Sequence, residues 1–374
     1  MALNEEKLCL LEDGKEAFPE IIRQIGAAKH KILVHMFIWR EDKIGIQIAE
    51  ELLTAADRGI SIIIEKDRYG LVFEYAEESQ RSLFHSPDLK DHFTIGFLEL
   101  AYNRELFFNK PYTKQSELCR RLKNHPNIEI HDDKKSRDHS KYYVFDDQIM
   151  ILGGVNIEDK ELYTDLRGRE YRDYMVKVDD PEMVRSFLAK IADPYNSCEQ
   201  LKVNRNDVGI FEIKDGFLKV IDQAEKELTI TMAYFAPDKD IMKAVKAALD
   251  RGVKVRILIS RKANNADDVN KLTAKKLLTY AQDNNADLKV YLIDRMLHAK
   301  LLMNEKTIIT GSCNITPRTF HHLSEMDICA ENDDSLFARQ VRSCVDDGFN
   351  NAECVSIKDL KFNSVKAYIE AEFA

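Results

Sequence analysis

The 374-residue sequence contains no long apolar run. Hydrophobic residues make up 44% of the chain, but no stretch approaches the roughly 20 apolar residues that a membrane-spanning helix needs. The first residues also lack the basic segment and the apolar core of a secretory signal. We therefore expect a cytoplasmic protein whose contact with a membrane is peripheral, at the inner face.

Cysteine is scarce, and its spacing shows no recognisable framework. The seven cysteines are an odd number, and no two of them have Cys-x-x-Cys spacing. This pattern argues against both a disulfide scaffold and a zinc ribbon, and it fits a reducing compartment.

A surplus of positive charge is missing as well. The chain has 55 lysine and arginine residues against 64 aspartate and glutamate residues, a net charge of −9. This balance disfavours broad adhesion to nucleic acid or anionic lipid, although a local basic cleft is compatible with it. We expect no obligate nucleic-acid partner.

His131-Asp132-Asp133 is a run of adjacent ligand-type residues that could be taken for a metal cluster. Three adjacent residues of a strand cannot all face one ion, because successive side chains point to opposite faces. We expect neither a metal nor a cofactor.

What the chain does contain is a two-fold internal repeat. Residues 17–39 predict a helix followed by a buried strand, and residues 216–236 predict the same pair. Residues 44–67 and 241–262 each predict an amphipathic helix that ends at Arg-Gly and leads into a β-branched strand. The alternation predicts an α/β protein with two duplicated lobes, each a mixed, largely parallel β-sheet flanked by helices.

We place the boundary between the lobes in a polar, turn-rich segment near residue 195. The N-terminal lobe then covers 1–195, with an insertion at about 71–125, and the C-terminal lobe covers 196–374. Within the insertion, residues 93–108 are apolar on several faces. They predict either a lid or extra helix packed on the core, or an interfacial segment that meets lipid.

One short motif stands at the centre of each half. His139-Ser140-Lys141 recurs 159 residues later as His298-Ala299-Lys300. Residues i and i+2 of a strand point to one face, so each histidine projects together with its lysine. Lysine supplies compact positive charge, a neutral imidazole can attack phosphorus, and a protonated imidazole can donate to the leaving oxygen. The four side chains predict attack on a phosphodiester.

Each motif is followed by a strand and then by Gly-x-x-Asn. The two copies read Gly153-Gly154-Val155-Asn156 and Gly311-Ser312-Cys313-Asn314. We expect the amides of Asn156 and Asn314, and the substrate-binding positions Gly154 and Ser312, to contact the same phosphate.

Basic residues surround the first motif in the sequence. They are Lys134, Lys135, Arg137, Arg167, Arg169 and Arg172. They predict either an ordinary solvated surface or a rim that attracts anionic headgroups or nucleic-acid phosphates.

The duplicated pattern resembles the phospholipase D superfamily over nearly the whole chain. Residues 10–45 and the stretch DHSKYYVFDDQIMILGGVNI are most similar to the bacterial cardiolipin synthase branch. The resemblance implies two phospholipase D-like lobes with the active site at their interface. The motif positions that match are His139, Lys141, Asp146, Gly153 and Asn156, then His298, Lys300, Gly311, Ser312 and Asn314.

The resemblance also implies roles for acidic residues. A downstream carboxylate orients each histidine, Asp173 in the first half and Glu325 in the second. In the second motif Glu305 replaces the aspartate that Asp146 supplies in the first, and its spacing to the following glycine is one residue shorter. A one-residue deletion in the turn accounts for the difference. We expect both motif acids to be structural rather than reacting groups.

The resemblance implies phosphatidyl transfer on phospholipids. Phosphatidylglycerol is the expected donor and acceptor, cardiolipin and glycerol are the expected products, and a phosphohistidine is the expected intermediate. We expect His139 to be the nucleophile and His298 the acid, although the sequence leaves their order open. Both motifs lie in one chain, which predicts an active monomer.

Three other functions share these residues. If water replaces the acceptor, the protein is a phospholipase D hydrolase. A phosphodiesterase or nuclease of the same superfamily uses the same side chains. An inactive lipid-binding scaffold is the non-enzymatic alternative, and the intact motifs argue against it.

Overall fold

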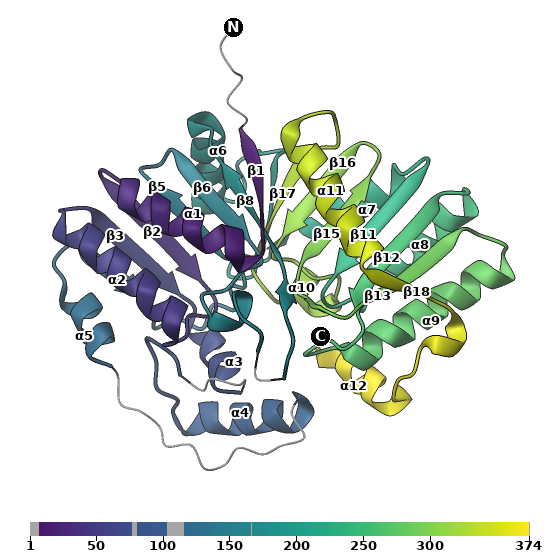
Figure 1. Cartoon of the computed structure of the whole chain (residues 1–374), viewed down its shortest axis with the longest axis horizontal. Helices are drawn as coiled ribbons and strands as arrows, with labels where there is room; N and C mark the ends of the chain where they lie inside the picture. The colour runs from purple at the N-terminus through teal and green to yellow at the C-terminus, as the bar shows by residue number, and fades with distance from the viewer. Residues whose placement is uncertain (1–6, 77–80, 103–115, 166, 374) are drawn as a thin grey trace, which may run out of the picture.

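Two β-sheets stand side by side in the computed structural model, each flanked by helices (Figure 1). The structure describes residues 7–76, 81–102, 116–165 and 167–373. The order of the first sheet is β1 (Leu8–Glu12), β8 (Tyr174–Val178), β6 (Ile149–Gly153), β5 (Tyr142–Phe145), β2 (Lys31–Met36), β3 (Ser61–Lys66) and β4 (Ile128–His131). The order of the second is β10 (Ile210–Phe211), β9 (Leu201–Arg205), β17 (Glu325–Glu331), β16 (Thr307–Gly311), β15 (Lys300–Asn304), β11 (Glu227–Met232), β12 (Lys254–Ser260), β13 (Leu288–Ile293) and β18 (Ala352–Val355).

The strand pairing repeats between the sheets, which confirms the duplicated α/β architecture. Strand β2 is parallel to β3 and antiparallel to β5, just as β11 is parallel to β12 and antiparallel to β15. The expectation of largely parallel sheets is wrong. Among the described strands of these two sheets, only β2–β3–β4 and β11–β12–β13 pair in parallel, and the other pairs are antiparallel. The reason is local, because each motif strand returns through a short turn as a hairpin, β5–β6 or β15–β16.

The helices predicted from the repeat form as expected. In the first lobe they are α1 (Asp13–Ala27) and α2 (Lys43–Asp57), and in the second α7 (Ile213–Asp222) and α8 (Lys239–Asp250). Each inward stripe is buried, as at Ile21 in α1 and Ile221 in α7. Gly59 and Gly252 follow α2 and α8 with φ of 90° and 82°, the left-handed conformation that ends a helix at little cost for glycine.

The remaining helices include the insertion of the first lobe. They are α3 (Leu71–Ala76), α4 (Leu89–Tyr102), α5 (Glu117–Asn124), α6 (Pro181–Ala192), α9 (Asp267–Asp283), α10 (Pro317–His321), α11 (Leu336–Asn350) and α12 (Ser364–Phe373). Ile95 of α4 is buried against α3, while Phe93 of the same helix is 83% exposed. The described part of the 93–108 segment therefore has a packed side and an exposed apolar side chain, and residues 103–108 lie outside the described ranges. None of the helices that the structure describes is long and apolar enough to cross a membrane.

The two lobes share a hydrophobic core. Leu152 and Val176 of the first sheet belong to the same buried cluster as Leu301 and Ile328 of the second. A short parallel ladder between β7 (Tyr171–Arg172) and β14 (Met296–Leu297) also joins the lobes. The first sheet uses residues up to 178 and the second uses residues from 201, on either side of the predicted boundary at 195. The domain limits themselves stay a prediction.

The two motif acids bind backbone at the start of the central strands. Asp146 accepts hydrogen bonds from the N–H groups of Lys29, His30 and Lys31 at 2.8, 2.8 and 2.9 Å, just before and at the start of β2. Glu305 accepts from the N–H group of Glu225 at 2.9 Å, next to the start of β11. The turn that carries Glu305 is one residue shorter, and the longer glutamate side chain reaches the equivalent backbone of the second lobe.

This contact predicts a stability effect at Asp146. Asp146→Asn removes the charge from three hydrogen bonds, and we expect the free energy of unfolding to fall by about 2 kcal/mol at pH 7. Although burial opposes the shift, the three N–H groups lower the pKa of Asp146. The contribution is therefore present above the unfolded pKa of about 3.9 and is lost as the pH falls through the folded pKa. Denaturant titrations from pH 7 down to about pH 2 measure it.

Asp147→Asn is the matched control for this prediction. Asp147 adjoins Asp146 but makes only an exposed ion pair with Lys31 at 3.6 Å, so we expect a change below about 0.5 kcal/mol. Equal effects of the two variants at pH 7 would contradict the structural role of Asp146.

Candidate active site

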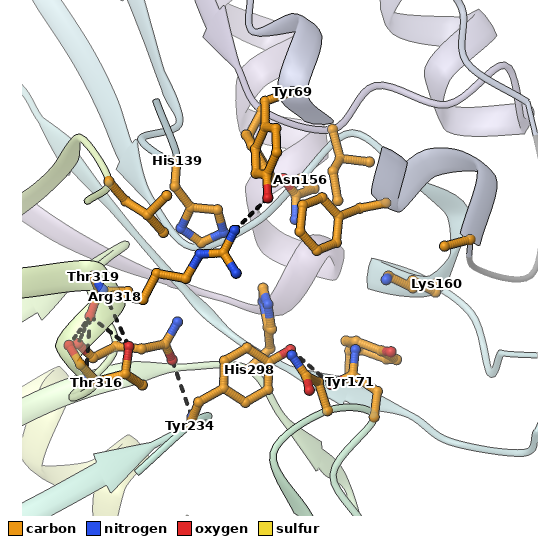
Figure 2. Close-up of a pocket in the computed structure, with 18 of the residues that line it drawn as sticks. Tyr69, His139, Asn156, Lys160, Tyr171, Tyr234, His298, Thr316, Arg318 and Thr319 are labelled. Carbon is orange, nitrogen blue, oxygen red and sulfur yellow. Dashed lines mark hydrogen bonds between the residues drawn. The ribbon is translucent and has the colours of Figure 1, made fainter. Parts of the chain in front are cut away.

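The two motif histidines come from different lobes and point into one pocket (Figure 2). Each is anchored by the backbone of the other lobe. The His139 N–H donates to the Ser324 carbonyl at 2.8 Å, and the His298 N–H donates to the Arg172 carbonyl at 2.7 Å. The pocket has a volume of about 120 Å³, and its lining includes Phe37, Tyr69, Phe73, His139, Asn156, Lys160, Arg167, Arg169, Tyr171, Tyr234, His298, Asn314 and Arg318.

The carboxylates that orient the histidines are exchanged between the lobes. His139 Nδ1 lies 3.0 Å from Glu325 Oε1, and His298 Nδ1 lies 2.6 Å from Asp173 Oδ2. The sequence analysis pairs each histidine with the carboxylate of its own half, His139 with Asp173 and His298 with Glu325. This pairing is wrong, because each histidine contacts the carboxylate of the other half. The ladder β7–β14 and the bridge between Asp138 and Ser324 bring each acid to the opposite motif. With Nδ1 engaged, Nε2 is the ring nitrogen left for a substrate.

The two motif lysines lie beneath the histidines rather than on the pocket wall. Lys141 and Lys300 are 1% and 2% exposed, and each Nζ donates to the carbonyl of the histidine two residues before it. Burial lowers the pKa of Lys141 to about 7 and lowers the pKa of Lys300 as well. An anionic substrate would favour the ammonium form of both lysines, because a phosphate charge offsets the cost of burying it.

Burial and the lysines also keep both imidazoles neutral. Burial, then the charges of Lys141 and Lys300, hold the pKa of His139 well below its usual value. Burial, then Lys300, lowers the pKa of His298 to about 4, although Asp173 opposes the shift. Neutral imidazole is the form that attacks phosphorus. A bound phosphate supplies negative charge and returns both pKa values toward the neutral range.

The two orienting carboxylates differ in their charge. Burial raises the pKa of Glu325 to about 8, so its charge state changes near neutral pH. Burial also acts on Asp173, but the Lys300 charge and the His298 ring outweigh it and lower the pKa of Asp173. An ionised Asp173 stabilises a proton on His298, whereas Glu325 gives His139 less of that support.

The asparagines of the two Gly-x-x-Asn segments lie in the same pocket as the two histidines. Asn156 and Asn314 both line the pocket, and Asn314 Oδ1 accepts a hydrogen bond from the Tyr234 N–H at 3.1 Å. That contact fixes the Asn314 amide with its NH₂ group as the donor left for a phosphate oxygen.

Gly154 and Ser312 lie behind the orienting carboxylates, not among the described residues that line the pocket. A Cβ at Gly154 would overlap the carboxylate of Asp173. The Ser312 hydroxyl donates to Glu325 Oε2, and Ser312 Oγ accepts from the Met326 N–H at 3.0 Å. Their direct contact with substrate stays a prediction, while the structure shows that each adjoins a carboxylate.

Some of the basic residues that surround the first motif in the sequence line the pocket, and others do not. Arg167 and Arg169 line the pocket, whereas Arg172 is buried and pairs with Glu12 and Asp347 at 2.8 and 2.9 Å. Arg172 is therefore not part of a rim. Tyr171, its neighbour in β7, lines the pocket, and successive side chains of a strand face opposite ways.

Sequence reasoning missed two further cations and an aromatic wall. Lys160 and Arg318 both line the pocket, each four residues after a motif asparagine, so the repeat itself carried the signal. Arg318 donates to the Tyr69 hydroxyl (Figure 2). Tyr69 lies just before the insertion and Phe73 at its start, and their ring centres are 6.3 and 5.5 Å from that of Phe37. The pocket thus has one apolar wall and one cationic wall.

A cluster of ligand-type side chains adjoins the second histidine. Oxygen atoms of Glu161 and Asp173 and a ring nitrogen of His298 lie within 4.8 Å of one another. The charges of Lys160 and Lys300 act on the Glu161 carboxyl, which opposes the binding of a cation there, and we assign no metal to it.

Fold and site together define a duplicated enzyme in which two histidine–lysine motifs share one active site. The chain belongs to the phospholipase D superfamily, and the family model described as cardiolipin synthase, PLD-like domain, matches residues 21–193 and 217–346.

Curated relatives carry the same name. Cardiolipin synthase B of Shigella flexneri is 25% identical over 337 residues, which cover 83% of this chain and 73% of the relative. A cardiolipin synthase of Halalkalibacterium halodurans is 27% identical over 343 residues, which cover 83% of this chain and 60% of the relative. The chain is therefore a cardiolipin synthase-like enzyme of the phosphatidyl-transferring kind.

A solved structure shares the fold. The phosphatidylserine synthase of Haemophilus influenzae Rd KW20 superimposes with a TM-score of 0.71 at 15% identity, covering 100% of this chain and 94% of that one. The similarity extends over both lobes and therefore over the arrangement of the two sheets.

Proposed function

We propose that this enzyme converts two molecules of phosphatidylglycerol into cardiolipin and glycerol through a phosphohistidine intermediate. The observation that carries the proposal is the pocket between the lobes, where two neutral imidazoles meet above two buried ammonium groups. Similarity to cardiolipin synthases supports the choice of lipid.

In the first step, His139 Nε2 attacks the donor phosphorus. The bond between phosphorus and the glycerol oxygen breaks, and His298 transfers its proton to that oxygen. The ionised Asp173 at 2.6 Å from Nδ1 supports the protonated form of His298 beforehand, which is why we assign the acid to this ring. Lys141, Lys300 and the two asparagine amides compensate the charge on the phosphoryl oxygens.

In the second step, an acceptor hydroxyl attacks the phosphohistidine. His298 takes the hydroxyl proton, the new phosphorus–oxygen bond forms, and the phosphorus–nitrogen bond to His139 breaks. The enzyme returns to its starting state. The apolar wall of Phe37, Tyr69 and Phe73 supports a lipid acceptor over water, because it removes part of the pocket from solvent.

We propose further that the enzyme acts as a monomer that binds the membrane surface from the cytoplasm. Both motifs occur in one chain and complete one pocket, which supports the monomer. Phe93 and Leu89 of α4 are 83% and 79% exposed, and exposed apolar side chains of this kind suit contact with lipid.

Incubation with phosphatidylglycerol vesicles tests the proposal. With chelator present and no metal added, we expect cardiolipin and glycerol in equal amounts, identified by mass spectrometry. His322→Ala should match the wild type, because His322 is exposed and lies outside the pocket lining. Phosphatidic acid as the main product would identify a hydrolase. Cleavage of single-stranded DNA with no change in the lipid would identify a nuclease.

A further inference from the structure

Glu161 is a buried carboxyl group that the mechanism above does not use. It ends the short 3₁₀ turn η2 (Asp159–Glu161), five residues after Asn156, and is 3% exposed. Neither of its side-chain oxygens has a hydrogen-bond partner among the described residues. An ionised carboxylate in such a place costs several kcal/mol, so the group needs a physical explanation.

Its surroundings favour the protonated form. The side chain lies within 4.8 Å of both Asp173 and His298. Burial, then the negative charges of Asp173 and Glu158, raise the pKa of Glu161 well above its usual value, against the opposing charges of Lys160 and Lys300. The other charged groups that adjoin it around the neighbouring cavity are Asp13, Lys15, Glu170 and Arg295.

The two orienting carboxylates differ in whether a neighbouring hydroxyl donates to them, and this difference suggests a role for a proton on Glu161. Glu325 receives a hydrogen bond from the Ser312 hydroxyl. Asp173 has Gly154 at the equivalent place, where a hydroxyl-bearing side chain would collide with it. As carboxylates, Glu161 and Asp173 can only accept and share no hydrogen bond, whereas a proton on Glu161 provides an O–H donor within 4.8 Å of Asp173.

The second half has no acid at the position of Glu161. Five residues after Asn314 stands Thr319, whose hydroxyl donates to the Asn314 carbonyl at 2.6 Å. The carboxyl therefore serves one of the two histidines only, the one bonded to Asp173.

We infer that Glu161 is a positioning residue that holds a proton beside Asp173 and thereby sets how strongly His298 binds its own proton. A donor to Asp173 weakens the attraction of that carboxylate for an imidazolium. His298 then releases its proton to the leaving oxygen more readily. The inference rests on the proposed function, because it takes His298 as the acid.

Two variants distinguish the hydrogen-bond donor of Glu161 from its ability to ionise. Glu161→Gln keeps a donor in the same place, and we expect kcat with phosphatidylglycerol to stay within about threefold of the wild type, with an unchanged pH profile. Glu161→Leu removes the donor. We expect the basic limb of its pH–kcat profile to move up by about one pH unit and kcat at pH 7 to fall about tenfold, because His298 retains its proton.

A substrate that needs no acid provides the control. The leaving group of phosphatidyl-p-nitrophenol departs without a proton, so the initial burst of p-nitrophenolate should be equal in the wild type and in Glu161→Leu. An equal loss of the burst and of transfer would show a purely structural role. An unchanged pH profile in Glu161→Leu, or stimulation by Zn²⁺ or Mn²⁺ that Glu161→Gln abolishes, would equally overturn the inference.

The pH dependence of the melting temperature tests whether Glu161 is protonated, without any assay of activity. An acid whose folded pKa is raised destabilises the protein increasingly as the pH rises above its unfolded value of about 4.3. Glu161→Gln should therefore raise the melting temperature, and by more at pH 8 than at pH 5. A lower melting temperature at pH 8 would mean that Glu161 is ionised and paired with a lysine. Failure of phosphatidylglycerol turnover would leave this measurement intact, so the two proposals fail separately.

Discussion

Replacing either motif histidine stops cardiolipin formation, but we expect only one replacement to stop formation of the covalent intermediate. His139→Ala removes the proposed nucleophile and should lower the rate by at least about 10⁴-fold. His298→Ala removes the proposed acid and base and should lower it by about 10²–10⁴-fold. With phosphatidyl-p-nitrophenol labelled in the phosphate, the alkali-quenched protein should carry label in His298→Ala and none in His139→Ala.

The reverse distribution of label would exchange the roles of the two rings. Absence of label from the wild type and from both variants would exclude the phosphohistidine. His322→Ala is the control for loss of an imidazole away from the pocket, and thermal melting of each variant shows whether it folds.

Exchange of the orienting carboxylates between the lobes predicts the second large effect. Glu325 serves His139 and Asp173 serves His298. With a substrate whose leaving group needs no proton, Glu325→Gln should therefore slow formation of the intermediate while Asp173→Asn slows its breakdown. Each substitution should cost on the order of 10²–10⁴-fold in kcat, because the amide holds the wrong tautomer or fails to stabilise the imidazolium.

Rapid mixing with phosphatidyl-p-nitrophenol measures the two steps apart. We expect Asp173→Asn to keep the initial burst and accumulate labelled protein, and Glu325→Gln to lose the burst. If Asp173→Asn instead lost the burst, as His139→Ala should, the carboxylate would act within its own half. Asp147→Asn, which removes an exposed carboxylate outside the pocket lining, controls for the change in net charge.

The sequence predicted the parts of this site that depend on local pattern. Helices such as α1 and α7 follow from apolar spacing, and the pairs His139–Lys141 and His298–Lys300 follow from a repeated motif. Both motif histidines and both motif asparagines do line one pocket. The chemical roles of these residues remain proposals that the variants above test.

The features that the sequence did not predict depend on contacts between distant residues. Residues 139 and 325 are 186 positions apart, and nothing in the local pattern of either one tells which partner it takes. Besides the local hairpins, distant pairing also reduced the parallel share of the sheets, because β8 pairs antiparallel with β1 and β17 pairs antiparallel with β9. Glu161 carried a weak signal, an acid five residues after a motif asparagine, but only its burial shows that the position is unusual.

The exchanged carboxylates constrain how a duplicated gene of this kind can evolve. After most duplications one copy can drift while the other maintains the original activity. Here the second copy encodes the carboxylate that orients His139, and the first copy encodes the one that orients His298. A damaging change in either copy therefore stops the reaction that needs both histidines. Neither half is redundant, so new functions arise more easily in segments outside the exchange, such as the insertion whose helix α3 brings Phe73 to the pocket.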